Sequence, residues 1–551
     1  MPEILAGGET DPGLRDLVVV SDLHLGRGFN PETKHWHRLE AFFHDDDFHA
    51  FCEWLCRDAS GRGAALALVL NGDALDLLRI EPDQPPEGAS GLERRFGPAV
   101  TAAVATRMVR DILRGHAAFV DALATVLAAG HEVVFLPGNH DLELQWAPVQ
   151  EEVRRAVAAR LDARGAPAAV LERLRFEPWF FHEPGRIWIE HGCQYDPENA
   201  FRFPLRRRMA DAPEAVTLAE RDMPFGNFFQ KYLYNAFGSI TFIVPSTRAN
   251  YRYFRFLLVN RPALLVSVAR SHGRFLVQLL RRLARAPAVA WQREAEQDHA
   301  AELAEIAERS GLGSQLREID DLKFVGADAA RAASGLLRQG AKLAAGIALV
   351  TIGAMLVWTA AWRALDTLMV GFGWKALMSL ALYLAFGAAG LAALIASALR
   401  VPPGEPLLRP LATAAQRIAS LVDVPLVTFG HSHEEVVSRI PRPDGNGWYF
   451  NTGTWTAVFT HDVLIPRERV QYTFLRVRGR EGELLQWSPG RGHPMPVVLL
   501  DEERASRVGL GEPRSYPGPP RTADTELKPP SACRPRHGID ERGDSGLDRR
   551  R

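Results

Sequence analysis

The chain has 551 residues and a mass of 61.0 kDa, which is room for roughly three or four structural domains. Its 65 Lys and Arg residues nearly balance its 66 Asp and Glu residues, and this balance excludes a histone-like or polyanionic protein. The hydrophobic share of 47% and the charged share of 24% exclude a chain that is disordered overall. Four cysteines are too few for a disulfide scaffold, and residues 1–17 lack the basic and apolar regions of a secretory signal, so we expect a reducing compartment and a cytosolic N-terminus.

Five short apolar runs, each ending in polar residues, predict buried strands that lead into a functional edge. They are residues 16–26, 65–73, 132–141, 186–192 and 425–433, and helix-like stretches at 50–60 and 101–130 separate the first three. Alternation of strands with helices predicts an α/β core. Because side chains at the carboxyl ends of neighbouring strands meet at one face, we expect the site to lie there.

A long segment separates the fourth predicted strand from the fifth, and we interpret it as an insertion into the core. Between Met223 and Arg293 it has no Asp or Glu, 11 Lys or Arg residues and 13 aromatic residues. An acidic helical stretch at 294–310 follows, and then two uncharged runs of 20 and 24 residues, 343–362 and 376–399. From about residue 501 the chain is rich in Pro, Gly and charge, which predicts a disordered tail.

Each predicted strand ends in side chains that can bind metals. In chain order the motifs are Asp22-Leu-His24, Gly72-Asp73-Ala-Leu-Asp76, Gly138-Asn139-His140-Asp141, His191-Gly192 and Gly430-His431-Ser-His433. Asp76 can either support the ligands from behind or cap the start of a helix. Carboxylate, imidazole and amide oxygen suit Mn, Fe, Zn or Ni better than they suit a thiolate-binding metal. Seven such ligands, with one carboxylate bridging, can hold two divalent ions about 4 Å apart. A purely structural role for these buried polar groups is the alternative.

In this order and strand context, the motifs resemble those of the calcineurin-like metallophosphoesterase superfamily. The resemblance covers about residues 14–200 and 420–480, and it implies a two-sheet α/β sandwich with two divalent ions, Mn first among them. It implies one metal held by Asp22, His24, Asp73 and His433, and another held by Asp73, Asn139, His191 and His431. It also implies that a metal-bound hydroxide attacks phosphorus, that His140 protonates the leaving oxygen or stabilises its charge, and that Asp141 orients the His140 ring.

Two further segments, SDLHLG at the first strand and HGCQYDPENAF after the fourth, look like one branch of this superfamily. That branch includes UDP-2,3-diacylglucosamine pyrophosphohydrolase, which cleaves a lipid-linked pyrophosphate. The branch typically has Gly-Asn-Arg-Asp where this chain has Gly-Asn-His140-Asp, the commoner form among other phosphoesterases. Four arginines that follow the fourth strand can either grip a phosphate or an anionic head group or form a solvated basic face: Arg202, Arg206, Arg207 and Arg208.

Both uncharged runs are long enough to cross a bilayer as helices, since twenty residues at a rise of 1.5 Å span about 30 Å. His191 precedes the pair and His431 follows it, so only an even number of spans keeps both in one site. The basic residues flanking the runs predict a multi-pass inner-membrane protein whose catalytic domain faces the cytoplasm. The alternative is a pair of buried helices in a soluble helical domain.

These patterns predict five regions: a first core part at 1–205, a basic and aromatic helical insertion at 206–330, a transmembrane helical hairpin at 331–402, a second core part at 403–500 and the tail at 501–551. The expected activity is hydrolysis of a phosphate ester or pyrophosphate, on a lipid or lipid-linked substrate at the membrane surface. A nucleotide or nucleic-acid phosphodiesterase is an alternative, because basic and aromatic side chains can stack bases, but such an enzyme does not need two apolar spans. A non-catalytic membrane scaffold is the other alternative, and it should have lost ligands that are all present here.

Overall fold

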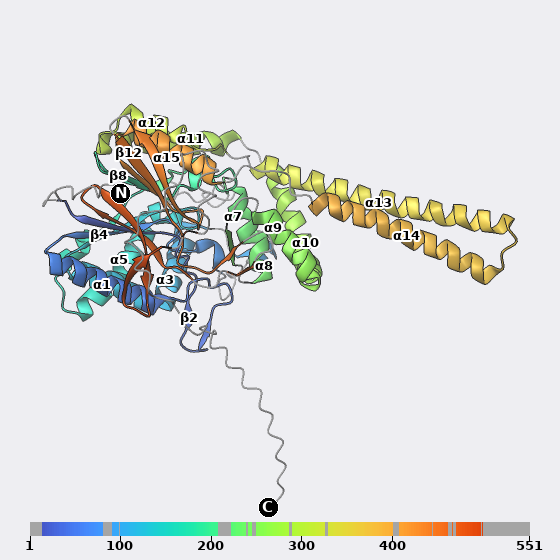
Figure 1. Cartoon of the computed structure of the whole chain (residues 1–551), viewed down its shortest axis with the longest axis horizontal. Coiled ribbons are helices and arrows are strands. Elements are labelled where there is room, and N and C mark those ends of the chain that lie inside the picture. The colour runs from blue at the N-terminus through green and yellow to red at the C-terminus, as the bar shows by residue number, and fades with distance from the viewer. Residues whose placement is uncertain are drawn as a thin grey trace, which may run out of the picture. The chain divides into compact units, whose positions relative to one another are not determined.

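The structure of the chain, a computed structural model, describes most of its residues. The described ranges are 14–80, 91–97, 100–207, 222–238, 241–244, 249–285, 289–325, 329–399, 407–442, 445–460, 465–466, 470–497 and 499. Within them the chain is a mixed α/β structure with several sheets and two long apolar helices (Figure 1). Arg208 and the tail expected at 501–551 lie outside the described residues.

The larger sheet has seven strands in the order β17-β16-β15-β1-β4-β5-β6. Their bounds are β1 Asp16–Val20, β4 Leu66–Asn71, β5 Glu132–Leu136, β6 Leu174–Phe176, β15 Thr473–Arg478, β16 Glu481–Ser488 and β17 His493–Pro496. Strands β1, β4, β5 and β6 pair in parallel, whereas β15 joins β1 antiparallel. Every residue of β1 and β4 is buried, which explains why their sequences are nearly continuous apolar runs. The first three predicted strands are confirmed.

Four helices pack with this sheet: α1 (Asp45–Arg62), α3 (Ala102–Gly115), α4 (Ala117–Ala128) and α5 (Ala147–Ala163). Their apolar side chains join those of the strands in one hydrophobic cluster. The stretch expected to be helical at 101–130 forms two helices, because His116 between them has a non-helical backbone with φ −119° and ψ 54°. The buried His116 ring contacts the Asp45 carboxylate at 3.0 Å, which joins the corner between α3 and α4 to the start of α1.

The second sheet has five strands in the order β11-β12-β10-β8-β7. Their bounds are β7 Phe180–Glu183, β8 Ile187–Glu190, β10 Leu426–Phe429, β11 Glu435–Arg442 and β12 Gly445–Thr452. Strand β10 is parallel to both β8 and β12, so the fourth and fifth predicted strands are confirmed as neighbours. Helices α11 (Val289–Ser310), α12 (Ser314–Asp320) and α15 (Leu408–Leu421) supply apolar side chains to its core. Strand β12 also contacts β15 and β16 of the larger sheet.

Short elements connect these layers within the described residues. They are β2 (Phe29–Asn30), β3 (His35–Trp36), α2 (Gly91–Phe96), η1 (Leu77–Arg79), η2 (Leu142–Gln145), η3 (Ala168–Arg173) and η4 (Cys193–Tyr195). Two of them, η1 and η2, begin a few residues after β4 and β5 respectively. They therefore lie close to the polar strand ends that the sequence singles out.

The inserted segment is largely helical, as expected, but it also contains a strand. Its first helical elements are α7 (Phe225–Phe229), the π-helical turn η6 (Gln230–Tyr234), α8 (Asn235–Phe237), α9 (Ala249–Asn260) and α10 (Pro262–Arg285). Strand β9 (Phe242–Val244) pairs in parallel with β13 (Val458–Thr460), which pairs with β14 (Ile465–Pro466). A strand of three residues is too short to show an alternating pattern, so the sequence gives no sign of it.

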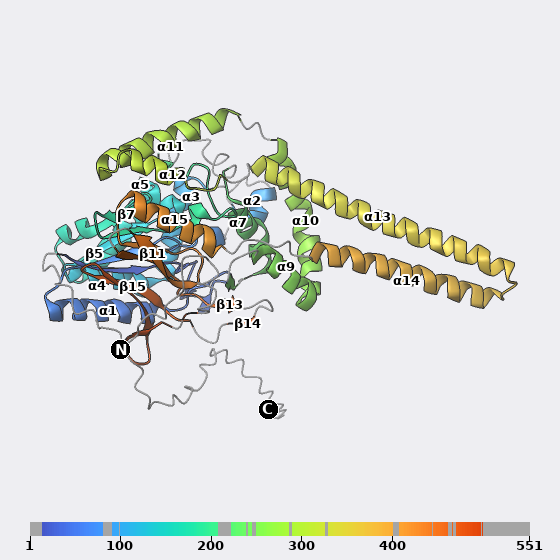
Figure 2. The ribbon, with the colours of Figure 1, turned by 45° about the horizontal axis from the view of Figure 1, so that its top comes forward.

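Helices α13 (Ala329–Thr367) and α14 (Phe372–Leu399) contain the two uncharged runs and form a hairpin. They lie side by side and extend away from the sheets (Figures 1 and 2). Only 6% of each apolar window is buried, and both helices are long and apolar enough to cross a membrane. Glycines allow the helices to approach closely: Gly353 faces Phe386, and Gly390 faces Val350.

Candidate metal centre

The predicted ligands follow the carboxyl ends of five parallel-paired strands, and the structure brings them together. Asp22 and His24 follow β1, Asp73 follows β4, and His191 follows β8. His431 and His433 lie between β10 and β11, and Asn139 follows β5. All seven residues are buried, none exposing more than 8% of its surface. Two groups form, Asp22 with His24 and His433, and Asp73 with His191 and His431, and the ligand atoms within each group lie within 4.8 Å of one another.

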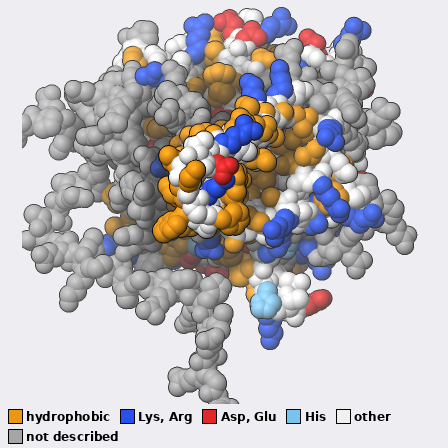
Figure 3. Space-filling view, turned by 90° about the vertical axis from the view of Figure 1, so that its right-hand side faces the viewer, with side chains coloured by type: hydrophobic (Ala, Val, Ile, Leu, Met, Phe, Trp, Pro, Cys, Tyr) orange, Lys and Arg blue, Asp and Glu red, His pale blue; other side chains and the backbone are white. Residues whose placement is uncertain are grey.

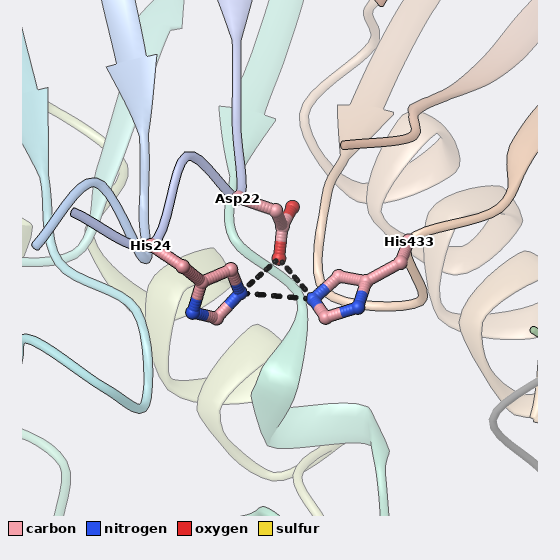
Figure 4. Close-up of side chains that lie close together, drawn as sticks. All are labelled: Asp22, His24 and His433. Carbon is pink, nitrogen blue, oxygen red and sulfur yellow. Dashed lines mark hydrogen bonds and ion pairs between the residues drawn. The ribbon is translucent and has the colours of Figure 1, made fainter. Parts of the chain in front are cut away.

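Two of the three distances in the first group match those between ligands of one ion, and the third is longer (Figure 4). Nε2 of His24 and Nε2 of His433 are 3.0 Å apart, and Nε2 of His433 is 3.1 Å from Oδ1 of Asp22. Nε2 of His24 is 3.8 Å from the same oxygen. Two ligand atoms that each lie about 2.1 Å from an ion, at tetrahedral or octahedral angles, are separated by about 3.0–3.4 Å. This spacing therefore suits a shared cation.

Asp73 belongs to the second group and also faces the first. Its Oδ2 is 3.8 Å from Nε2 of His24 and 3.3 Å from Nε2 of His191. One carboxylate oxygen thus faces an imidazole of each group, which is the arrangement that a bridging ligand needs. The other oxygen, Oδ1, accepts a hydrogen bond of 2.7 Å from the backbone N–H of His140, which places the Asn139-His140 segment beside it.

Three atoms of the predicted ligands are buried and make no hydrogen bond of good geometry among the described residues: Asp22 Oδ1, Asn139 Oδ1 and His191 Nε2. Two of them still have a close polar neighbour, His433 Nε2 for Asp22 Oδ1 and Asp73 Oδ2 for His191 Nε2. A buried polar atom without a partner costs about 1–3 kcal/mol, so native structures contain few of them. All three belong to donor types that bind divalent first-row metals. The residues present therefore fit a metal ion, and the buried His and Asp groups can hold one.

The backbone at these ligands is unusual. Among the described residues, nine non-glycine residues have a positive φ, and five of those nine are predicted ligands: Asp22, His24, Asp73, His431 and His433. Their φ angles lie between 49° and 66°, in the left-handed region that costs most side chains of order 1 kcal/mol or more. Strain concentrated in this way is typical of functional sites, where the surrounding structure holds the side chains in place.

Glycines beside the ligands permit their close approach. A Cβ atom at Gly72 would overlap the His191 ring, and one at Gly138 would overlap the Asp73 carboxylate. Gly72 also has a φ of 79°, which favours glycine over any other residue. These two positions explain why the strand ends read Gly-Asp and Gly-Asn.

Two residues that the sequence reasoning did not assign hold predicted ligands in place. Asp196 Oδ2 lies 2.9 Å from Nε2 of His431, which leaves Nδ1 of that ring for a metal. Asn227, in the insertion, accepts a hydrogen bond of 2.9 Å from Nδ2 of Asn139. It also donates a hydrogen bond of 2.6 Å to the backbone carbonyl of Asn139. These bonds occupy the Asn139 amide nitrogen and leave its Oδ1 free. Asp196 belongs to a motif noted in the sequence, whereas no sequence pattern singles out Asn227.

The geometry corrects one expectation about His140. Its Nδ1 contacts Asp76 Oδ1 at 2.8 Å, so Asp76 orients the ring, where Asp141 was expected to do so. The Asp141 carboxylate instead accepts hydrogen bonds from the backbone N–H groups of Gly138 and Leu75, at 2.6 and 3.1 Å. The backbone N–H group of Asp73 also donates to this carboxylate. Asp141 therefore holds the loops after β4 and β5 together.

The electrostatics of the site reflect its excess of negative charge. Burial lowers the pKa of His24 to about 4, so this imidazole is neutral and suited to binding a metal. Burial also opposes protonation of His191, but the charges of Asp73 and Asp22 outweigh it and raise its pKa to about 10. Burial and the nearby Asp73 charge raise the pKa of Asp141 to about 7. Cations bound between Asp22 and Asp73 would relieve this excess charge.

The four arginines are placed differently from one another. Arg206 is buried, lies 3.3 Å from Asp222 and stacks on the Phe201 ring. Arg207 pairs with Glu302 and Glu305 of α11, so its charge is neutralised there. The Arg202 backbone N–H donates to Asp222 Oδ1, and Arg208 lies outside the described residues. Of the described three, only Arg206 lines the pocket beside the predicted ligands.

This pocket encloses about 650 Å³ of space, part of it continuous with solvent. Apolar side chains line most of it, with polar groups at a few points: Leu77, Leu78, Val100, Asn139, Leu142, Glu143, Trp146, Phe201, Arg206, Met223, Asn227 and Lys231. Asn139 belongs to both the pocket and the predicted metal centre, so the two adjoin. No protein-family model and no curated protein matches this chain.

Proposed function

We propose that the chain is a metal-dependent hydrolase of phosphate esters or pyrophosphates, with the two-sheet sandwich fold of the calcineurin-like metallophosphoesterases. The observation that carries this proposal is the placement of Asp73 between two groups of buried ligand atoms, several of which make no hydrogen bond of good geometry among the described residues. Two divalent ions bound there, with Mn first among the candidates, would supply Lewis acidity and a water of lowered pKa. Phosphoryl transfer needs mainly this charge neutralisation together with correct positioning.

The protein's own residues would position the substrate and move a proton. Asp76 holds Nδ1 of His140, so Nε2 is the ring atom that can give a proton to the leaving oxygen. Burial lowers the pKa of His140, but the charges of Asp76 and Asp73 outweigh it and raise the pKa, which favours a role as an acid. Asp141 keeps the β4 and β5 loops in register, so it acts on the reaction through Asp73 and His140.

The pocket supports a substrate that is both apolar and anionic. Its wall is largely aliphatic and aromatic, and it also contains Lys231, Glu143 and Arg206, the last of which is paired with Asp222. A lipid or lipid-linked phosphate matches both features, since its tail would lie on the apolar wall and its phosphate would meet the cations.

The hairpin supports a place for the enzyme at a membrane, and we infer that α13 and α14 cross the inner membrane with the sheets on the cytoplasmic side. Arg338 and Lys342 are exposed near the start of α13, and Lys and Arg side chains lie around the hairpin where it meets the rest of the chain (Figure 3). Five exposed arginines in and between α9 and α10 add to this charge: Arg255, Arg261, Arg270, Arg274 and Arg281. At the tip, Lys375 is paired with Asp366. The asymmetry matches a cytoplasmic, anionic lipid surface at the base.

A hydrolysis panel on the detergent-solubilised full chain tests the proposal. The panel contains phosphatidic acid, a polyprenyl diphosphate, a nucleoside monophosphate, a cyclic nucleotide and p-nitrophenyl phosphate, each with Mn²⁺. We expect hydrolysis of at least one lipid, its loss with a chelator and its return with added Mn²⁺. Rapid hydrolysis of nucleotides with both lipids untouched would contradict the lipid assignment. A protein that binds Mn²⁺ and hydrolyses nothing would contradict the enzymatic one.

A further inference from the structure

An aromatic side chain from the insertion lies directly on the predicted metal centre. The Phe242 ring centroid is 4.3 Å from the His24 ring and 4.3 Å from the His433 ring, in tilted and T-shaped contacts. It is 6.3 Å from the His140 ring. The ring therefore touches two predicted ligands and stands beside the proposed proton donor.

The position of this ring is held from two sides. Strand β9 pairs with β13 through Phe242 and Val458, and the next two residues of β9, Ile243 and Val244, are buried. On the other side, the Arg79 guanidinium lies 4.4 Å from the ring centroid, and Arg79 is itself fixed by Asp76 at 3.1 Å. The insertion is thus anchored to the core at the point where it reaches the centre.

The predicted ligands have different surroundings. Phe242 covers His24 and His433. Asn139 lines the apolar pocket, whose described lining includes neither of those histidines nor Phe242. The lining residues Leu77, Leu78 and Leu142 are close in sequence to Asp76 and His140, so we assign the leaving group of the substrate to this pocket.

We propose that Phe242 is a wall of the active site that restricts it to terminal phosphate groups, which are phosphomonoesters or the end phosphate of a diphosphate. A phosphodiester carries a second substituent besides the leaving group, and that substituent would need the space that the Phe242 ring occupies. This inference rests on the proposed function and deepens it, because it assigns the substrate class. It also makes the site composite, since the wall comes from the insertion and the ligands come from the core.

Two substrates with the same leaving group test the wall, p-nitrophenyl phosphate and bis(p-nitrophenyl) phosphate. For wild-type protein loaded with Mn²⁺ we expect a higher kcat/KM on the monoester. Phe242→Ala should raise the diester-to-monoester ratio of kcat/KM by about tenfold, and Phe242→Leu by less. Phe459→Ala is the matched control, because Phe459 faces Ile243 in the same small sheet and packs on Phe256. Its ratio should equal that of the wild type.

A second readout separates the wall from the chemistry. Water-proton relaxation by bound Mn²⁺ reports access of solvent to the metal, and Phe242→Ala should increase it at least about twofold while Phe459→Ala leaves it unchanged. Equal relaxation in all three proteins, an unchanged ratio or a wild-type preference for the diester would overturn the wall. Bound Mn²⁺ without hydrolysis of either substrate would overturn the proposed function, and the relaxation would still decide the wall. Absence of Mn²⁺ binding would overturn both.

Discussion

The candidate metal centre and the α13–α14 hairpin differ in which groups they bury and which they expose. In the centre, Asp22, Asn139 and His191 bury polar atoms that make no hydrogen bond of good geometry among the described residues. In the hairpin, large apolar side chains such as Leu349 and Leu356 are 69% and 64% exposed. Cations would satisfy the buried lone pairs of the first region, and hydrocarbon would cover the exposed aliphatic groups of the second.

The two regions also differ in how the backbone is used. Five predicted ligands in the centre have a left-handed backbone, which only the surrounding packing can maintain. The hairpin consists of two regular helices whose close approach needs only glycines such as Gly353 and Gly390. A substitution in the centre should therefore abolish metal binding and hydrolysis. A substitution in the hairpin should instead change the free energy of transferring the helices into lipid.

The largest expected effect tests the centre. Asp73→Asn removes the charge that faces both ligand groups, so we expect loss of bound Mn²⁺ and a fall in kcat/KM of at least about a thousandfold. Metal content and hydrolysis of p-nitrophenyl phosphate measure it. Asp423→Asn is the control, since Asp423 has a similar φ of 51° and a side chain that is 91% exposed. Equal metal content in the two variants would show that Asp73 does not hold a metal ion.

The next effect tests the hairpin. Ile352 is 54% exposed in the middle of the first uncharged run, and Ile352→Arg should oppose insertion by about 3 kcal/mol. We expect a larger fraction of the protein to leave membranes in an alkaline carbonate wash. Leu368→Arg places the same charge in the turn after α13, where Leu368 is 70% exposed, and it should stay in the membrane fraction. If both variants fractionate alike, the hairpin does not cross the bilayer.

The smallest effect sharpens the contrast, because only the core contains a buried histidine held by two acids. Burial opposes protonation of His116, but hydrogen bonds with Asp45 and Glu40 raise its pKa to about 9 from an ordinary 6.5. Its stabilisation is therefore fully present below about pH 6.5 and is lost as the pH rises through about 9, a change of about 3 kcal/mol. Urea midpoints measured in detergent at pH 6.5 and 9 should show the loss.

The His116→Gln variant provides the comparison for this pH effect. Its urea midpoint should be lower than that of the wild type at pH 6.5 and should change little up to pH 9. His493→Gln, at an exposed position in β17, should keep the wild-type dependence. A His116→Gln protein that loses as much stability at alkaline pH as the wild type would show that another group is responsible.

The core strands and the ligand-bearing ends could be predicted from the sequence because each signal is local. Continuous apolar runs predict parallel strands that are buried on both faces, and β1, β4 and β10 follow this rule. The polar residues that end these runs then share one edge, which is why Asp22, Asp73 and His431 could be grouped before any geometry was known.

The remaining parts of the site depend on pairings between distant segments, and single-sequence patterns do not contain them. Asn227 reaches Asn139 and Phe242 reaches His433 only because the insertion folds back onto the core. The exchange of Asp141 for Asp76 beside His140 had a similar cause, since spacing along the chain does not reveal which carboxylate is consumed by backbone N–H groups. The left-handed backbone at the ligands is likewise a product of packing.

The pairing of β8 with β10 has a consequence for how the protein is made. His191 leaves the ribosome roughly 240 residues before His433, a delay of about 10–50 s at ordinary rates of translation. During that interval the nascent chain holds only part of its ligand set, and both apolar helices emerge before the set is complete. A metal centre that needs His191, His431 and His433 can therefore be completed only after both apolar helices have been synthesised.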